Sequence, residues 1–331
     1  MKTLFYKLPT GEEIFSYRIR GEHTEAEILT RGATLRSLWA YGTDVVCGFD
    51  MPEVYIENPG YLGAVVGRVA NRIKDGELYI DGECYNLTKN EPHATLHGGE
   101  SFAHRNFTVT EYKTDSITLA YTSPDGEGGF PGEVAVSVTY TVEGDALIID
   151  YTAIPNKKTA IALTNHAYFN LDGCGSISNH RLKIWAEEYT EVNENLIPTG
   201  NHPAVSGTPF DFSTMRRIGD GFLSGISGYD HNFLLSPDTY GSFNEKELGL
   251  AAVLEGEQLR MYAYTDQPGV QIYTANHFGA GPLLKGGVPS VKHGAVCLEM
   301  QTEPNSANRG VGIYGAGEIY RQTTAYKFEV K

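Results

Sequence analysis

The sequence predicts an all-β protein, a large antiparallel β-sandwich. Short segments rich in β-branched and aromatic residues recur along its 331 residues, and several alternate between apolar and polar positions. Turn-forming residues separate these segments, since the chain contains 38 Gly and 15 Pro. Amphipathic helical patterns are scarce, and no linker or internal repeat divides the chain. We therefore expect residues 1–331 to form one domain, a length that all-β folds can reach.

The clearest strand pair lies in residues 134–154. In "VAVSVTYTV" (134–142) apolar residues occupy alternate positions, which predicts a strand with one buried face. The turn "EGD" leads into "ALIIDYTAI" (146–154), so the two strands are expected to form a hairpin. "ELYIDGECYNL" repeats this pattern around Asp81-Gly82, a pair that favours a tight turn. Further strands are predicted at 116–123, 181–189, 259–266, 270–276 and 295–301.

Three long segments lack strand and helix patterns: 123–133, 200–230 and 275–294. Irregular segments of this length are uncommon in compact domains and often line a functional site. We expect the site to involve these loops.

The charge balance indicates a neutral ligand. Acidic residues outnumber basic ones 41 to 26, which disfavours nucleic acid and anionic membranes as partners. No apolar run approaches the ~20 residues of a membrane span, and the first residues lack a signal-peptide pattern, so we expect a cytoplasmic protein. The four cysteines are far apart and form no C-x-x-C pair. We interpret them as reduced core residues.

Two polar residues interrupt the apolar segment "LTNHAYFNL" (163–171). A buried amide or imidazole without a partner costs about 1–3 kcal/mol, so Asn165 and His166 must be satisfied or useful. Glu299 raises the same question between Leu298 and Met300 in "CLEMQTEP". Burial there is expected to raise its pKa towards a value suited to proton transfer.

Three other stretches hold polar residues in apolar surroundings. They are Asn71 and Arg72 in "GRVANRI", His97 in "LHGG" and Asp230 in "GYDHNF". A surface arginine, a core histidine and a turn cap are the ordinary structural interpretations. Alternatively, Arg72 and Asp230, with Gln271 of "GVQIYTAN", bind sugar hydroxyls.

Taken together, these pieces resemble the aldose 1-epimerase (galactose mutarotase) family. The match runs in the family's order from about residue 58 to 328, and the ordered set is far more specific than any single motif. Its segments are "NPGYLGAVVGRVANRIKDGELYIDGECYNLTKNEPHATLHGG", "SPDGEGGFPGEV", "LTNHAYFNLDG", "TPFDF", "GYDHNF", "GVQIYTAN", "CLEMQTEPNSAN" and "EIYRQTTAYKF".

The resemblance implies a galactose mutarotase-like supersandwich that interconverts the α and β anomers of free aldohexoses such as galactose or glucose. It implies no metal or organic cofactor. By motif, Glu299 is the general base on the anomeric hydroxyl, His166 the general acid at the ring oxygen, and His97 the second active-site histidine. Asn71, Arg72, Asp230 and Gln271 match sugar-binding positions. On this interpretation, the hydrogen bonds of Asn165 and His166 are directed at a sugar, and Tyr168 and Phe169 form walls.

The chain departs from the family pattern at two places. Phe107 lies near a position where the family often has Trp, and Asn305 follows Pro304 where Asp is usual. We expect both positions to lie beside the site and not at the acid or base, so they bear on substrate preference and loop shape more than on reaction type.

Several alternatives stay open from the sequence. A sugar-phosphate epimerase of the same superfamily would need a basic cluster, and only Arg216-Arg217 lies near a candidate loop. A non-catalytic carbohydrate-binding protein would keep the pocket without the reaction. A glycoside hydrolase would need two carboxylates, for which Asp230 and Glu299 are the available pair. His97, His166 and Glu299 are suitable zinc ligands, but their wide spacing gives no support. The preferred aldose and the oligomeric state are not determined by the sequence.

Overall fold

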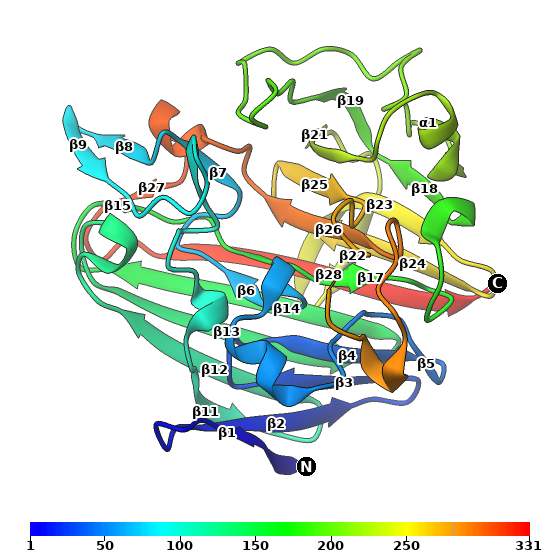
Figure 1. Cartoon of the computed structure of the whole chain (residues 1–331), viewed down its shortest axis with the longest axis horizontal. Coiled ribbons are helices and arrows are strands. Elements are labelled where there is room, and N and C mark those ends of the chain that lie inside the picture. Colours follow the sequence, from blue (N-terminus) through cyan, green and yellow to red (C-terminus); the bar gives the residue numbers. More distant parts are fainter. Residues whose placement is uncertain (280) are drawn as a thin grey trace.

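A computed structural model describes residues 1–279 and 281–331, and it is built almost entirely of antiparallel strands (Figure 1). The largest sheet has ten strands. In spatial order they are β11 (Thr108–Tyr112), β12 (Ser116–Ser123), β13 (Val134–Glu143), β14 (Ala146–Pro155), β28 (Tyr320–Val330), β24 (Leu259–Thr265), β23 (Lys246–Glu255), β18 (Arg181–Ile184) and β20 (Arg216–Arg217), with β22 (Tyr240–Phe243) also paired to β23.

Two five-stranded sheets accompany it. The N-terminal sheet contains β1 (Lys2–Lys7), β2 (Glu13–Arg20), β3 (Thr24–Leu29), β4 (Leu35–Ala40) and β5 (Thr43–Asp44). The other sheet has the order β17 (Tyr168–Phe169), β26 (Val296–Gln301), β25 (Gly269–Tyr273), β21 (Asp230–Leu235) and β19 (Ala186–Tyr189). We call this second group the site sheet, because it carries Asp230, Gln271 and Glu299.

Short strand pairs and helical turns complete the chain. The pairs are β6 (Val65–Val66) with β16 (Thr164–Asn165), β7 (Arg72–Lys74) with β10 (Ala94–Leu96), β8 (Glu77–Ile80) with β9 (Glu83–Asn86), and β15 (Thr159–Ala160) with β27 (Ile313–Tyr314). The helix α1 spans Gly219–Leu223, and 3-10 turns occupy Pro52–Ile56, Pro59–Tyr61, Phe102–His104, Glu127–Gly129, Ile177–Asn179, Lys285–Gly287 and Ser306–Arg309. Within the described ranges, no helix is long and apolar enough to cross a membrane.

The predicted hairpins are confirmed. In β13 every second side chain is buried, from Val134 to Val142, and the strand pairs in register with β14. In the β8–β9 hairpin, Asp81 and Gly82 both have positive φ, as a tight turn requires.

The predicted strand 181–189 is divided between two sheets. Residues Arg181–Ile184 pair with β23 in the large sheet, whereas Ala186–Tyr189 pair with β21 in the site sheet. Trp185 lies at the point where the chain changes sheets. Such a change of partner cannot be inferred from alternation, because both halves keep strand geometry.

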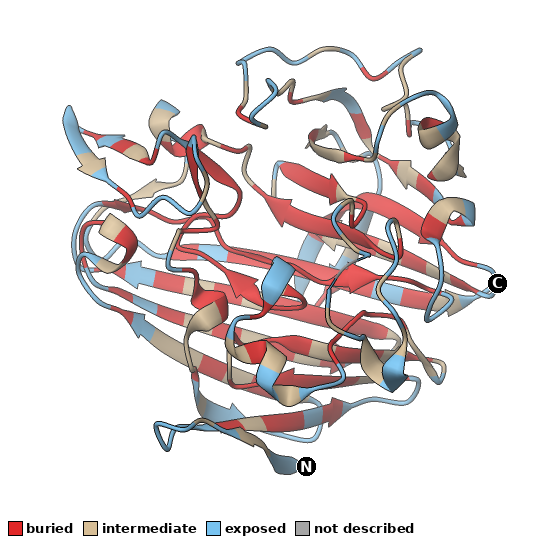
Figure 2. Cartoon of the chain, in the orientation of Figure 1, coloured by how far each residue is buried: buried red, intermediate tan, exposed pale blue. Residues whose placement is uncertain are grey.

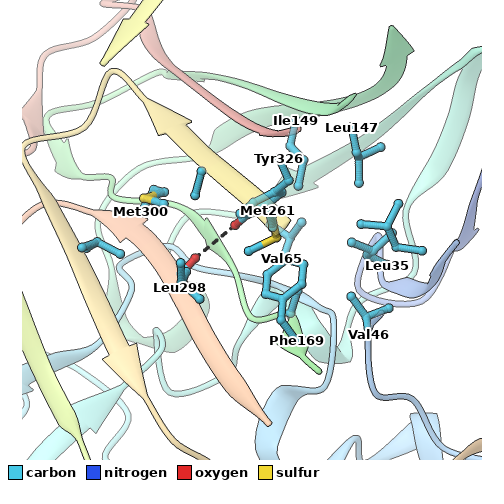
Figure 3. Close-up of a cluster of buried hydrophobic side chains, with 14 of the residues drawn as sticks. Leu35, Val46, Val65, Leu147, Ile149, Phe169, Met261, Leu298, Met300 and Tyr326 are labelled. Atoms are coloured by element: carbon cyan, nitrogen blue, oxygen red, sulfur yellow. Dashed lines mark hydrogen bonds between the residues drawn. The ribbon is translucent and has the colours of Figure 1, made fainter. Parts of the chain in front are cut away.

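The site sheet packs against the large sheet through one apolar core. Buried residues concentrate on the central strands, while β9 and many loops are largely exposed (Figure 2). On β26, Leu298 and Met300 point into this core, where the Tyr326 hydroxyl from β28 donates a hydrogen bond to the Leu298 carbonyl at 3.0 Å (Figure 3). Because the side chains of Leu298 and Met300 fill the core, the other face of β26 is the one that can carry polar side chains.

Candidate active site

A cavity of about 400 Å³ opens on the face of the site sheet away from the core. Its volume falls within the range of small-molecule sites. Six of the seven predicted site residues line it: Asn71, Arg72, His97, His166, Asp230 and Glu299. The seventh, Gln271, does not line the cavity and lies behind Asp230.

Glu299 reaches the cavity because side chains alternate along β26. Its neighbours Leu298 and Met300 are core residues, so Glu299 points to the other face. Its side chain is only 3% exposed, and its Oε2 atom has no hydrogen-bond partner among the described residues. Burial raises the pKa of Glu299 well above its usual value, the Asp230 carboxylate raises it further, and Arg72 opposes both. A carboxyl group in this setting holds a proton more readily than a surface glutamate does.

His166 faces Glu299 from the junction between β16 and β17. Its main chain is anchored on both sides, because its N–H donates to the Ala64 carbonyl and its carbonyl accepts from Gly63 N–H, each at 2.9 Å. The Nε2 atom lies 3.7 Å from Oε1 of Glu299, and the Nδ1 atom lies 3.5 Å from Sγ of Cys297. Burial lowers the pKa of His166 to about 4, so the imidazole is neutral at physiological pH in the empty site.

His97 is held by a reciprocal main-chain contact with Asn71. The Asn71 N–H donates to Nδ1 of His97 at 3.1 Å, and the His97 N–H donates to the Asn71 carbonyl at 3.0 Å. Because Nδ1 accepts, the neutral ring carries its proton on Nε2. Burial, with repulsion from His166 and Arg72, keeps the pKa of His97 well below 6.5. Gly98 is required beside it, since a Cβ there would lie 2.2 Å from the Gly67 carbonyl oxygen.

Two further polar side chains are pre-positioned by partners. Gln271 donates from Nε2 to Oδ1 of Asp230 at 2.7 Å, which leaves the second carboxylate oxygen of Asp230 for a ligand. Burial raises the pKa of Asp230, whereas Arg72 and the Gln271 hydrogen bond lower it. Arg72 is bound by Glu91 through two contacts, Nε to Oε2 at 2.7 Å and Nη2 to Oε1 at 2.9 Å.

The expected role of Asn165 is wrong. Its Nδ2 donates to the Gly63 carbonyl at 2.7 Å and to the Tyr140 hydroxyl at 3.3 Å, and it does not line the cavity. Asn165 therefore ties β16 to the core instead of contacting a ligand. Phe169 also points into the core, where it packs against Tyr326 (Figure 3), and only Tyr168 of the two expected walls lines the cavity.

The three predicted loops contribute unequally. The segment 275–294 supplies cavity residues, including His277, Phe278 and Leu284. The segment 200–230 contributes only its last residue, Asp230. The segment 123–133 does not reach the cavity; the Arg68 guanidinium binds it through the carbonyls of residues 123, 124 and 131.

Other lining residues were not found from the sequence. Tyr61, Tyr273, Phe278 and Glu91 all line the cavity. Tyr273 could have been found, because it lies two residues after Gln271 on the same strand face. Tyr61 lies in a 3-10 turn and Phe278 in a loop, and neither has a sequence pattern that separates it from core residues.

The structure also brings together three side chains of the kind that bind metals. Ligand atoms of His97, His166 and Glu299 all lie within 4.8 Å of one another, which their sequence spacing did not predict. A metal-bound histidine normally donates its other ring N–H to an acceptor. Nδ1 of His97 instead faces a donor, the Asn71 N–H, so its Nε2 carries the proton where a metal would need a lone pair. The site does not fit a metal at His97.

Comparison with known proteins gives a consistent result. The sequence profile described as aldose 1-epimerase matches residues 16–327. Galactose mutarotase from Mus musculus is 38% identical, with 99% of this chain and 98% of that protein covered. Aldose 1-epimerase from Escherichia coli (strain K12) is 34% identical, with 86% and 85% covered. The crystal structure of an aldose epimerase homologue from C. elegans superposes with a TM-score of 0.86 at 27% identity, covering 95% of this chain and 98% of that one. The chain belongs to the aldose 1-epimerase family of isomerases.

Proposed function

We propose that this protein interconverts the α and β anomers of free aldohexoses such as galactose or glucose, with Glu299 as general base and His166 as general acid. One observation carries the proposal: a buried carboxyl group and a buried imidazole lie side by side, with Oε1 of Glu299 3.7 Å from Nε2 of His166, in the lining of one cavity. Ring opening needs a proton removed from the anomeric hydroxyl and another delivered to the ring oxygen. One base and one acid are sufficient for both transfers.

The two groups together hold one exchangeable proton. Before ring opening, Glu299 is ionised and His166 is protonated; after it, Glu299 carries the proton and His166 is neutral. Burial, which raises the pKa of Glu299 and lowers that of His166, favours the second arrangement in the empty site. A bound sugar, with its anomeric hydroxyl against Glu299 and its ring oxygen against His166, supplies hydrogen bonds for the ionised form. Reclosure reverses both transfers and yields either anomer.

The two histidines have different roles in this proposal. Nδ1 of His97 is occupied by the Asn71 N–H, so His97 cannot add a second proton there and serves as a fixed hydrogen-bond donor through Nε2. His166 has no main-chain N–H at Nδ1, where it faces the Cys297 sulfur, and can become an imidazolium ion. His166 is therefore the acid, and His97 orients the sugar together with Asn71, Arg72 and Asp230.

The charges favour a neutral sugar over a phosphorylated one. Arg72 is the only Lys or Arg among the described residues that line the cavity, and Glu91 already pairs with it. Arg216 and Arg217 do not line the cavity. Asp230 and Glu299 add acidic groups, so a phosphate would enter without a free cation to bind it.

Polarimetry on freshly dissolved α-galactose and α-glucose tests the proposal. Glu299→Gln and His166→Ala should each lower kcat by at least about 10²-fold, the scale of general acid–base catalysis. Glu111→Gln and His23→Ala alter exposed residues of the same types and should retain normal rates. Near-normal activity in either site variant would refute the assigned roles. Sugar binding by the wild-type protein without anomer exchange would instead support a non-catalytic binding protein.

A further inference from the structure

Cys297 lies beside the candidate acid without lining the cavity. It is fully buried and precedes Glu299 by two residues on β26, so both side chains lie on the same face of the strand. Its Sγ atom is 3.5 Å from Nδ1 of His166, a normal separation for a hydrogen bond that involves sulfur. Among the described residues, this thiol has no other hydrogen-bond partner.

We propose that Cys297 is a positioning residue: its sulfur accepts a hydrogen bond from Nδ1–H of His166 and leaves Nε2 as the nitrogen that exchanges a proton with the sugar. The inference rests on the proposed function, since it concerns the group that is assigned there as the acid. It adds a residue outside the cavity to the proton-transfer machinery.

The proton count supports this direction of the hydrogen bond. Nε2 is the ring nitrogen that faces Glu299, at 3.7 Å, so protons move at Nε2. A neutral imidazole keeps one ring proton, and if Nε2 is to lose and regain its own, that remaining proton must reside on Nδ1. The atom opposite Nδ1 is the Cys297 sulfur. Burial raises the pKa of this thiol well above its usual value, so the sulfur stays a neutral thiol, whose lone pairs can accept the Nδ1 proton.

A weak hydrogen-bond acceptor at Nδ1, such as sulfur, suits the role of His166 as a general acid. In hydrolase triads a carboxylate at Nδ1 stabilises the imidazolium ion, which favours a base. A neutral sulfur holds the Nδ1 proton with little such stabilisation. The aromatic rings packed against the His166 ring are those of Tyr61, His97, Tyr168 and Tyr273. Among the described residues, Glu299 is the only carboxyl group within 4 Å of a ring nitrogen of His166. An imidazolium ion formed here is a strong acid.

Nitrogen-15 NMR on histidine-labelled, sugar-free protein tests the tautomer directly. The His166 signals are assigned by their loss in His166→Ala. We expect the neutral His166 ring to carry its proton on Nδ1 in the wild type and to shift towards the Nε2–H form in Cys297→Ala. Cys47→Ala, which alters another buried cysteine of the same apolar cluster without a contact to His166, should leave the signals unchanged. A predominant Nε2–H tautomer in the wild type would overturn the inference.

Kinetics provide the second test. Cys297→Ala should lower kcat between about twofold and about tenfold, the loss expected for one modest hydrogen bond, with KM little changed. The acid limb of the pH profile should move to lower pH, because the imidazolium ion loses an acceptor. Cys297→Ser, whose hydroxyl can accept the same proton, should restore most of kcat, and Cys47→Ala should resemble the wild type.

An unchanged kcat and pH profile in Cys297→Ala, or no rescue by Cys297→Ser, would contradict the inference. Failure of the proposed function is recognised separately, by full activity in Glu299→Gln or His166→Ala. The tautomer is measured without sugar and does not depend on that outcome.

Discussion

At the scale of single residues, the site depends on which atom each side chain has free. Glu299 and Gln271 occupy paired positions on neighbouring strands, yet only Glu299 lines the cavity, while Gln271 binds Asp230. His97 and His166 have the same ring and similar burial, but a main-chain donor faces Nδ1 of one and a thiol faces Nδ1 of the other. The chemical role of each side chain therefore depends on which of its polar atoms is already bound by another protein group and which is free for a ligand.

Glu299 should lower stability at neutral pH. Its pKa is raised in the folded protein above the value of 4.5 expected when unfolded. A folded state that binds more protons than the unfolded state loses stability as pH rises. The stability that protonated Glu299 contributes is therefore complete below pH 4.5 and declines as the pH rises above that value. Glu299→Gln removes this dependence. We expect the melting temperature of the variant to exceed that of the wild type by a margin that grows from acidic to neutral pH.

Thermal unfolding of both proteins across this pH range measures the margin. Asp230 is retained in both proteins and provides a common background, although its pKa is raised in the same direction. A margin that is equal at acidic and neutral pH would contradict the burial effect on Glu299. The prediction also implies that this substitution gains stability while it removes activity, as expected for a functional group held in an unfavourable environment.

His166 should show the opposite dependence on pH. Its folded pKa of about 4 lies below the value of 6.5 expected when unfolded. The unfolded chain then binds the proton first, so stability declines as pH falls through this interval. In the enzyme, catalysis should also decline near pH 4, where His166 and Glu299 both hold protons and no base remains. Initial rates of mutarotation measured by polarimetry against pH check this decline. Undiminished activity below pH 4 would contradict the proposal that Glu299 and His166 share one proton.

At the scale of elements, β26 combines core and site on its two faces. Leu298 packs into the core and Glu299 points into the cavity, and the Tyr326 hydroxyl anchors the strand from β28 (Figure 3). We expect Leu298→Ala to lower the free energy of unfolding by about 2–5 kcal/mol, the usual cost of an unfilled core cavity. Denaturant unfolding measures this value. A loss below about 1 kcal/mol would mean that β26 is not held by the core in this way.

Strands with alternating apolar and polar residues were predictable from the sequence, whereas the strands with which they pair were harder to predict. The alternation in β13 and the Asp81-Gly82 turn identify their hairpins because strand pairing there is local. The divided strand at Trp185 and the two short strands on either side of His166 depend on distant partners. No local pattern specifies such partners, and propensity is weak against tertiary contacts.

At the scale of the whole molecule, the sequence indicated most of the site but not its geometry. Polar residues in apolar segments pointed to Glu299, His166, His97, Arg72 and Asp230, and the family pattern assigned their roles. Asn165 met the same criterion as His166 and proved structural, because the criterion detects burial of a polar group and not its partner. The sequence indicated only that Cys297 is a core residue, because its sulfur comes near His166 only in the folded chain.

The charge of the whole chain should select against anionic sugars. The net charge is −15, and two of the acidic residues that contribute to it, Asp230 and Glu299, line the cavity. We expect kcat/KM for glucose 6-phosphate to be at least about tenfold below that for glucose, and the gap to narrow at high salt as the repulsion is screened. Glucose itself should show little dependence on salt. A preference for the phosphorylated sugar would contradict the neutral-substrate assignment.

The proton shared by Glu299 and His166 is tested most directly by a double-mutant cycle. Polarimetry would give kcat/KM for the wild type, Glu299→Gln, His166→Ala and the double variant. Because each transfer depends on the other, we predict that the double variant is little slower than the slower of the two single variants. Losses that multiply, so that the double variant is slower by the product of both single effects, would show that the two groups act independently and would contradict the account.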